Sequence, residues 1–334
     1  MHVEHLKFLV CPKSGRPLTL VTPAEFGRHG QVKRGLLLES DSGRRYPIVD
    51  HIPRFVSDDD YARSFGFQWN IHARTQYDDY AGFSASRERF ERETKWGREL
   101  PGLSILEVGS GAGRFTRHAL STGATVVSFD SSSAVTANWS SNGENPNLLL
   151  VQASIFEVPF PPLMFDRVFC FGVLQHTPDP KAAFFSIVNL LKPGGTIAAD
   201  IYVKDIRNWL LNPKYWVRPF FRGKQPDRLY GFVKRYIDLM WPVAKILRRI
   251  PRIGHALNWR LLIADHSGFL ADASDPLLKE WAYLDTFDMI SPLYDKPQTL
   301  KTFRSWHEEA GLQDIDVHLG FNGIEGRGTR PAYE

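Results

Sequence analysis

Apolar and polar positions follow a regular rhythm in the middle of the chain. Between Leu103 and Tyr202, short apolar runs alternate with longer segments that carry apolar residues on one side only. Buried parallel strands and amphipathic helices produce this rhythm when helices cover both faces of a sheet. The pattern therefore predicts an α/β fold built on a doubly wound sheet.

The first part of the chain has a different pattern. Leu36–Leu38 and Tyr46–Val49 are short apolar runs separated by the turn-forming residues Asp41–Gly43. Such runs bounded by turn residues predict strands. We therefore expect residues 1–57 to form a small β-rich domain, which the acidic break Asp58–Asp60 separates from the rest.

Two further segments interrupt the sheet pattern. Residues 58–100 are rich in aromatic residues and arginine at helix-compatible spacing, which predicts lid or linker helices. Residues 205–285 are also helical in pattern and are expected to form an insert. The core of the fold is then expected from residues 101–204 and 286–334.

The composition indicates an ordinary globular protein. Of 334 residues, 43% are hydrophobic and 23% are charged, and the formal net charge is +4. No apolar run approaches the roughly 18 to 20 residues of a membrane span, and the first residues do not form a signal peptide. The two cysteines, Cys11 and Cys170, make no disulfide framework, which favours a cytoplasmic location.

A glycine-rich turn carries the strongest chemical signal. The run Ser104–Arg114 is an apolar strand that ends in an acidic residue and leads through three glycines into a helix. Glycines allow a ligand to approach the backbone, and the helix N-terminus favours a carboxylate. A dinucleotide-binding turn would need a glycine at Arg114, which disfavours a dehydrogenase. The next strand ends at Asp130, where a carboxylate can accept the hydroxyls of a ribose.

Further motifs follow in order along the same segment. Phe165–Val168 reads F-D-R-V, Leu174–His176 reads L-Q-H, and Leu191–Gly195 reads L-K-P-G-G before the strand Thr196–Asp200. Together with the glycine turn and Asp130, these motifs resemble those of the class I S-adenosylmethionine-dependent methyltransferases. The resemblance covers about residues 103–203.

The resemblance implies a Rossmann-like sheet of seven strands with S-adenosyl-L-methionine as the cofactor. The glycine turn would surround the methionine part, Asp130 would hold the ribose, Ser154 and Ile155 would flank the adenine, and Phe171 and Gly172 would lie beneath the sulfonium. Ser154 departs from the family, which often has aspartate there. The implied cofactor-binding residues are Glu107, Gly109, Ser110, Gly111, Gly113, Asp130, Ser131, Ser154, Ile155, Phe171 and Gly172.

Other residues are candidates for catalysis and for the methyl acceptor. His176 follows the fourth core strand and could act as a general base, or it could be a structural histidine that packs the loop. Trp69 and Tyr77 could face the sulfonium or could serve only as packing. Asp288 and Tyr294 are candidates for an acceptor pocket, while the nearby Asp285 could simply cap a helix.

The front domain resembles the small zinc-ribbon-like domain of the tRNA-methyltransferase activator family. The resemblance rests on Leu9–Pro12, Arg16–Leu18 and Arg45–Pro53. In that family a second cysteine completes the first metal-binding knuckle, whereas Ser14 stands at that place here. One thiolate cannot make a tetrahedral zinc site, so we expect a metal-free domain that docks on the catalytic core.

Charge is concentrated in the helical insert. Residues 205–264 contain 13 Lys or Arg against 3 Asp or Glu, so the rest of the chain is net acidic. This segment could be a solvated cap, could bind a phosphorylated or nucleotide-linked acceptor, or could contact an anionic membrane. Pro242 and Pro251 are expected to break any single long amphipathic helix, which weakens the membrane interpretation.

Together the motifs predict a methyltransferase that moves a methyl group to oxygen or nitrogen of a small-molecule acceptor, such as a sugar, a lipid precursor or a secondary metabolite. The alternatives are an RNA- or protein-modifying methyltransferase and a binding protein that retains the fold without catalysis. Phe171–Leu174 stands where an N-P-P-Y-type amide-binding motif would be, which weighs against an RNA- or protein-modifying methyltransferase. Nucleic acid is not an expected partner, and no required protein partner is identified.

Overall fold

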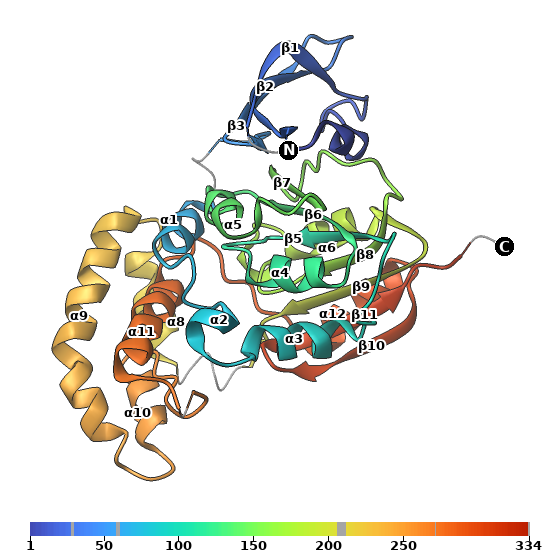
Figure 1. The fold of residues 1–334 in the computed structure, drawn as a ribbon. Helices are drawn as coiled ribbons and strands as arrows, with labels where there is room; N and C mark the ends of the chain where they lie inside the picture. The colour runs from blue at the N-terminus through green and yellow to red at the C-terminus, as the bar shows by residue number, and fades with distance from the viewer. Residues whose placement is uncertain (28–29, 58–60, 206–211, 271, 333–334) are drawn as a thin grey trace.

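The chain folds into three parts, two of which, the central sheet and the layer of helices, surround a cavity. The computed structural model describes residues 1–27, 30–57, 61–205, 212–270 and 272–332, so the acidic break at residues 58–60 lies outside the described residues. A small N-terminal sheet, a large central sheet and a layer of helices lie side by side (Figure 1).

The central sheet has seven strands in the order β10-β11-β9-β8-β5-β6-β7. The five strands from β7 to β9 are parallel, and β11 and β10 are added antiparallel at the edge beside β9. This architecture confirms the predicted α/β fold with a seven-stranded sheet. The strands are β5 (Ser104–Val108), β6 (Thr125–Asp130), β7 (Leu148–Gln152), β8 (Phe165–Cys170), β9 (Leu191–Ile201), β10 (Gln313–Gly320) and β11 (Gly323–Thr329).

Alternating strand residues face two separate apolar clusters, one on each side of the sheet. Ile105 of β5 packs into one cluster, whereas Leu106 and Val108 pack into the other. Successive side chains of a strand point to opposite faces, so a strand buried on both faces is apolar throughout. Helices α3 (Ala85–Thr94), α4 (Arg114–Ser121) and α5 (Val135–Asn142) cover the first face, and α6 (Pro180–Val188) and α12 (Leu300–Glu309) cover the second.

Strand β9 begins earlier than the sequence indicates. The run Leu191–Gly195, expected to precede the strand, is its first half. Leu191 pairs with Phe165, and the register then shifts before Thr196 pairs with Arg167. The two glycines occupy this irregularity, so the strand continues across a local change in register.

The N-terminal sheet docks on the central sheet through shared apolar packing. Phe8 stacks on Phe165 of β8 with 6.2 Å between ring centroids, and the Phe55 amide donates to the Gln152 carbonyl at 2.8 Å. One apolar cluster continues from this domain into the core. The domain contains a 3₁₀ helix η1 (Val3–Phe8) and the antiparallel strands β1 (Thr19–Phe26), β2 (Val32–Leu38), β3 (Arg45–Val49) and β4 (Ile52–Pro53).

The helical layer packs around an apolar cluster of its own. Its longest helix, α9, lies at the outer margin, and α11 lies between α9 and the central sheet (Figure 1). Within the described residues, no helix combines the length and apolar character needed to cross a bilayer. The helices are α1 (Arg63–Ile71), α2 (Asp78–Ala81), α8 (Pro213–Phe221), α9 (Pro226–Leu247), α10 (Gly254–Arg260) and α11 (Asp275–Ile290), the last of which crosses the expected boundary between insert and core.

The expectation that Pro242 breaks the helix is wrong. Helix α9 continues through Pro242 for a total of 22 residues. A proline inside a helix removes one backbone hydrogen bond, but packing of the apolar face can outweigh this cost. Trp241 and Ala244, on either side of the exposed Pro242, are both buried in the cluster of the helical layer. Pro251, in contrast, lies in the turn after α9.

A buried arginine ties α3 to the central sheet. Arg89 pairs with Glu93 at 2.6 Å and with Asp200 of β9, and all three side chains are buried. Burial, with the nearby charge of Asp200, raises the pKa of Glu93 to about 8. The Gly172 amide and the Asn322 side chain also donate to Asp200. Arg89 is therefore the cation that compensates the buried Asp200 carboxylate, while Glu93, with a pKa of about 8, is mostly protonated at neutral pH.

Replacing Arg89 is expected to destabilise the protein strongly. In Arg89→Gln the buried Asp200 carboxylate loses its cation, which should lower the free energy of unfolding by about 3–5 kcal/mol in urea denaturation. The matched control is Arg87→Gln in the same helix, where the lost ion pair with Glu91 is exposed and worth less than about 1 kcal/mol. Equal losses in the two variants would contradict this role.

Docking of the N-terminal domain can be tested at Phe8. Because Phe8 is buried against Phe165, we expect Phe8→Ala to cost about 3–5 kcal/mol and to move a single thermal transition of the whole chain. The control Phe26→Ala removes an exposed ring from the same domain and should change little. A separate early transition, with the remainder unmoved, would show that the two parts unfold independently.

Candidate functional site

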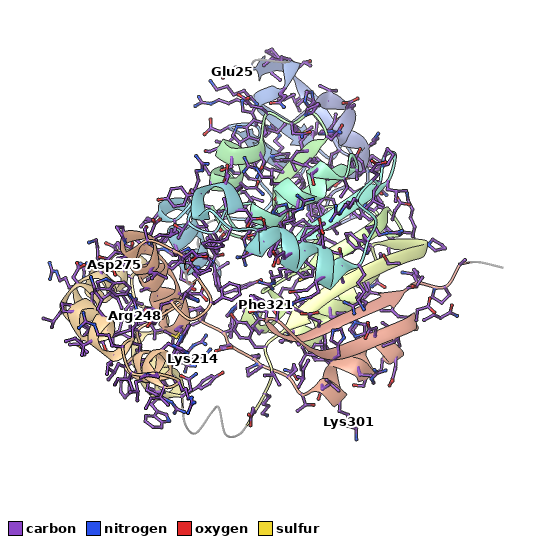
Figure 2. All side chains as sticks on the ribbon, turned by 60° about the horizontal axis from the view of Figure 1, so that its bottom comes forward. Glu25, Lys214, Arg248, Asp275, Lys301 and Phe321 are labelled. Atoms are coloured by element: carbon purple, nitrogen blue, oxygen red, sulfur yellow. The ribbon has the colours of Figure 1, made fainter. Side chains whose placement is uncertain are left out.

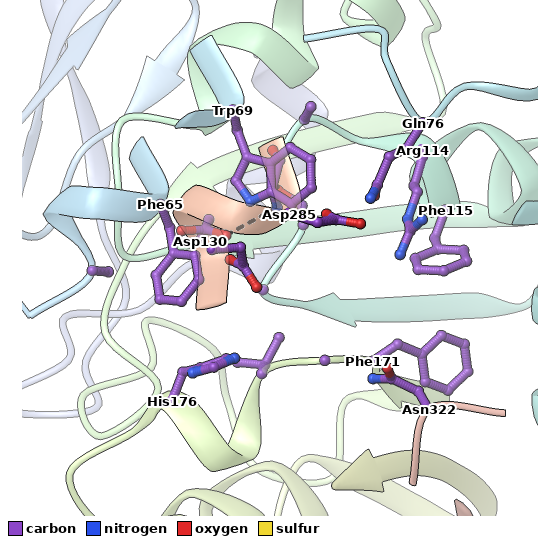
Figure 3. A pocket seen from close by; sticks show the side chains of 18 of the residues that line it. Phe65, Trp69, Gln76, Arg114, Phe115, Asp130, Phe171, His176, Asp285 and Asn322 are labelled. Atoms are coloured by element: carbon purple, nitrogen blue, oxygen red, sulfur yellow. Dashed lines mark hydrogen bonds between the residues drawn. The ribbon is translucent and has the colours of Figure 1, made fainter. Parts of the chain in front are cut away.

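A cavity of about 490 Å³ opens at the carboxyl ends of β5, β6 and β8. Ligands of open α/β sheets bind at this edge. Helix α1 and the helical layer complete its walls, so residues far apart in the sequence face one another (Figure 3). The lining includes twelve of the predicted site residues: Trp69, Tyr77, Gly109, Ser110, Gly111, Asp130, Ser131, Ile155, Phe171, Gly172, His176 and Asp288.

The glycine turn forms one wall of the cavity. Gly109 and Gly111 have positive φ angles of 74° and 51°, a conformation that glycine adopts without strain. A Cβ atom on Gly109 would lie 2.2 Å from a methyl carbon of Val173, so a side chain cannot fit there. The Trp69 indole lies over Gly111, where a Cβ atom would be 3.2 Å from its Nε1. The turn is thus held close to its neighbours with its backbone toward the cavity.

Asp130 fixes this turn to the next strand. Its carboxylate accepts hydrogen bonds from the Gly111 amide at 3.0 Å and from the amide and hydroxyl of Ser132 at 2.8 and 2.7 Å. Burial raises the pKa of Asp130, while these hydrogen bonds act in the opposite direction. Carboxylate oxygens have further lone pairs, so the group can still accept hydroxyl donors from a ligand.

Glu107 lies behind the turn and does not line the cavity. Its carboxylate accepts from the hydroxyls of Thr116 and Ser128, and burial raises its pKa to about 7. Gly113 is also outside the lining, and its carbonyl accepts from the Asn142 side chain at 3.1 Å. Both residues support the turn from the protein side.

Tyr77 uses its hydroxyl to hold the same turn. The hydroxyl donates to the Ala112 carbonyl at 2.8 Å and accepts from the Asn142 amide at 2.9 Å. Burial raises the pKa of Tyr77 to about 12, so the phenol stays protonated. The ring lines the cavity, but its polar group is directed to the backbone.

At the β7 end of the site, Ile155 lines the cavity and Ser154 does not. The Ser154 hydroxyl accepts from the Phe156 amide at 3.2 Å, which closes a local turn. Ala153 and Phe129 add apolar surface beside Ile155. This end of the cavity therefore suits a flat apolar group.

His176 presents one ring nitrogen for chemistry. Its Nδ1 lies 3.0 Å from the Tyr294 carbonyl, which can only accept, so Nδ1 carries the proton and Nε2 is a free acceptor. Within the described residues Nε2 makes no hydrogen bond. Phe65 and Tyr202 pack on the ring, and burial lowers the pKa of His176. Tyr294 itself does not line the cavity but orients His176 through its backbone.

Helix α11 faces both the cavity and the helical layer. Asp285, Asp288 and Met289 line the cavity, whereas Leu278 and Phe287 pack into the apolar cluster with α9. Asp288 accepts from the Gln68 amide at 2.9 Å, and burial raises its pKa. Asp285 lies inside the helix and bonds to His266 at 2.5 Å, so it is not a helix cap.

Several charged residues of the cavity lining are not among those that the sequence predicts. Arg114, first residue of α4, lies beside Phe115 with no carboxylate at ion-pair distance within the described part of the chain, and burial lowers its pKa to about 10. Its place directly after the last glycine was the available signal. Lys214 and Arg218 of α8 pair with Asp295, an arrangement between distant segments that spacing does not reveal.

Comparison with known proteins gives a family match inside this fold. Residues 106–199, which carry the glycine turn, Asp130 and His176, match the family described as "Methyltransferase domain". The ubiquinone biosynthesis O-methyltransferase of Thiobacillus denitrificans is 29% identical over 116 residues, which cover 34% of this chain and 50% of that protein. The chain thus spans about half the length of this relative.

Two other similarities extend over more of the chain. The sterol 24-C-methyltransferase of Yarrowia lipolytica is 23% identical over 305 residues, covering 86% of this chain and 75% of that protein. The structure of human N-acetylserotonin methyltransferase in complex with S-adenosylmethionine covers 82% of this chain and 57% of that chain, with 14% identity and a TM-score of 0.39. The resemblance of residues 1–57 to the activator family remains a prediction.

The family match coincides with the part of the chain that forms the glycine turn and the strand tips around the cavity. The methyltransferase domain expected from the sequence is confirmed for residues 106–199 of this chain.

Proposed function

We propose that this chain is an S-adenosylmethionine-dependent methyltransferase that acts on oxygen or nitrogen of a small molecule. The main support is the joint position of the Gly111 turn and the Asp130 carboxylate at the edge of one cavity. A volume of about 490 Å³ lies within the range of small-molecule and cofactor sites. The family match over residues 106–199 supports the same reaction class.

The polar residues of the cavity suit the parts of this cofactor. Asp130 would accept the ribose hydroxyls, and the backbone from Gly109 to Gly111 would surround the methionine part. Arg114 would pair with the methionine carboxylate, because it is a partly buried cation at the cavity wall that lacks an anionic partner among the described residues. Ile155 would pack on the adenine. When bound, the cofactor supplies a methyl group activated by a positively charged sulfur.

The chain's own contribution to the reaction is alignment and proton removal. The cavity would hold a nucleophile in line with the methyl carbon and exclude water. His176 Nε2 would accept the proton that an acceptor hydroxyl or amine loses, because Nδ1 is held by the Tyr294 carbonyl and His176 lines the cavity. Its lowered pKa keeps the ring neutral, and hence basic, at neutral pH.

The acceptor side of the cavity is largely aromatic. Trp259, Phe269 and Trp281 line it together with Met289, and Asp288 adds a polar group. An acceptor with an apolar body and one hydroxyl or amine fits these walls. The named relatives act in ubiquinone biosynthesis and on a sterol, which agrees with a lipid precursor or a secondary metabolite. A cytoplasmic location remains part of this proposal.

Cofactor binding can be measured without knowing the acceptor. Asp130→Asn removes the charge from the hydrogen bonds to the ribose, so the affinity for S-adenosylhomocysteine should fall about ten- to hundredfold by isothermal titration calorimetry. The control Ser154→Ala changes a residue outside the cavity and should bind like the unmodified chain. Absence of binding by the unmodified chain would refute the proposed function.

The role of His176 predicts a separate effect on rate. With a panel of phenols, alcohols and amines and radiolabelled methyl donor, His176→Gln should lower kcat about 10²- to 10⁴-fold while affinity for S-adenosylhomocysteine is kept. A base acts when deprotonated, so activity should be full at neutral pH and fall with an apparent pKa below 6.5. An acid limb at or above pH 6.5, or one retained in the variant, would contradict this assignment.

A further inference from the structure

The outward face of α9 carries an unusual combination of residues. Phe232, Leu239 and Ile246 follow one another at intervals of seven residues, and Arg228 and Arg235 precede them at the same interval. Two helical turns take about seven residues, so these five side chains form one stripe along the helix. The opposite side of α9 is buried against the helical layer. The stripe thus faces away from the protein core.

The stripe continues onto α8. Phe221 of α8 stacks on Phe232 with 5.6 Å between ring centroids, which brings the end of α8 against α9. Trp216 and Phe220, one turn apart on α8, are exposed like the apolar residues of the stripe. The exposed fraction of the five large apolar side chains ranges from 53% at Phe232 to 75% at Leu239; the other three are Trp216, Phe220 and Ile246. Exposed apolar groups in such number mark an interaction surface.

The charge of this region is almost entirely positive. Residues 212–261 hold 12 Lys or Arg and only two acidic residues, Asp227 and Asp238. Asp238 is already paired with Lys279 at 2.7 Å and with Lys234 at 3.4 Å. Within the described residues, four basic side chains next to the apolar groups make no ion pair: Arg222, Lys224, Arg228 and Arg235.

Other basic residues of the layer serve internal contacts. Arg248 bonds to the buried Asp265 at 2.9 Å, and Lys245 pairs with Asp275 at 3.3 Å. Figure 2 shows Arg248 and Asp275 in the helical layer, away from Glu25 of the N-terminal sheet and Lys301 of α12. Arg248 and Lys245 are therefore neutralised within the layer, unlike Arg222, Lys224, Arg228 and Arg235.

We propose that this α8–α9 face docks on an anionic lipid bilayer. Aromatic and aliphatic side chains would enter the boundary between head groups and acyl chains, and the arginines would pair with lipid phosphates. The uninterrupted helix α9, about 33 Å long at 22 residues, allows the whole stripe to lie in the plane of the bilayer. The docking face consists of Trp216, Phe220, Arg222, Lys224, Arg228, Phe232, Arg235, Leu239 and Ile246.

The same observations disfavour two other binding partners for this face, a second copy of the chain and nucleic acid. A second copy of the chain would bring two strongly basic surfaces together across a twofold axis, since residues 212–261 hold 12 Lys or Arg against only Asp227 and Asp238. Nucleic acid would satisfy the positive charge but would leave Phe220, Leu239 and their apolar neighbours against phosphates. An anionic bilayer complements both components of the face.

Vesicle flotation tests this proposal with the full chain. We expect the protein to float with vesicles of phosphatidylcholine and phosphatidylglycerol, to remain unbound with phosphatidylcholine alone, and to dissociate as salt is raised. The readout does not involve methyl transfer. Because S-adenosylhomocysteine affinity is measured in parallel, failure of docking and failure of the proposed enzymatic function are distinguishable.

Two variants test the apolar residues and the arginines of the face separately. Phe232→Glu/Leu239→Glu should abolish flotation, and Arg228→Gln/Arg235→Gln should weaken binding to the anionic vesicles at least about tenfold. The matched control is Leu319→Glu, which charges an equally exposed leucine on β10, outside the face. If the glutamate variant loses its cooperative thermal transition, the glutamine variant, which leaves all apolar packing intact, still decides the test.

Three results would overturn the proposal. One is equal binding of the unmodified chain to neutral and anionic vesicles, or to neither. Another is a dimer in analytical ultracentrifugation that Leu239→Glu dissociates, which would assign the face to a second copy. The last is binding of a random-sequence oligonucleotide at physiological salt that competes with the vesicles, which would assign the face to nucleic acid.

Discussion

The site depends on one hydrogen bond between two neighbouring strand ends. The Gly111 amide, at the end of β5, donates to the Asp130 carboxylate, at the end of β6. Because both strands are parallel, their ends lie at one edge of the sheet, and the bond fixes the distance between the turn and the carboxylate. Burial disfavours the charge on Asp130, and the Gly111 and Ser132 donors compensate for it. The cavity edge is thus rigid before any ligand arrives.

The rest of the structure supports this edge with buried polar contacts. Tyr77 holds the Ala112 carbonyl, Glu107 accepts from α4 and β6, and Arg89 pairs with Asp200 of β9. Each of these groups would be costly to bury alone, and each is satisfied by a partner from another element. Helix α3 and Tyr77, directly before α2, are therefore attached to the sheet and its glycine turn by polar contacts as well as by apolar packing.

The sequence alone could predict the parts of the site that one segment encodes. The glycine turn and Asp130 lie in a short stretch whose order reflects the order of the strands. The partners of His176 and Asp288 come from distant segments, so spacing could not reveal them. Strand β11 was also not visible, because Gly323–Thr329 contains three glycines and little apolar surface. The continuation of α9 through Pro242 could not be predicted either, because it depends on the packing of Trp241 in the helical layer, which outweighs the lost backbone hydrogen bond.

Helix α11 and the edge of the central sheet form different walls of the cavity and come from different parts of the chain. One side of this helix lines the cavity with Asp285, Asp288 and Met289, and the other side packs into the apolar cluster of the helical layer, while the sheet edge is encoded between Ser104 and His176. Substitutions on the cavity side of α11 can therefore change this wall without changing the strand ends. A chain built in this way can vary one wall of its cavity by exchanging residues on a single helix.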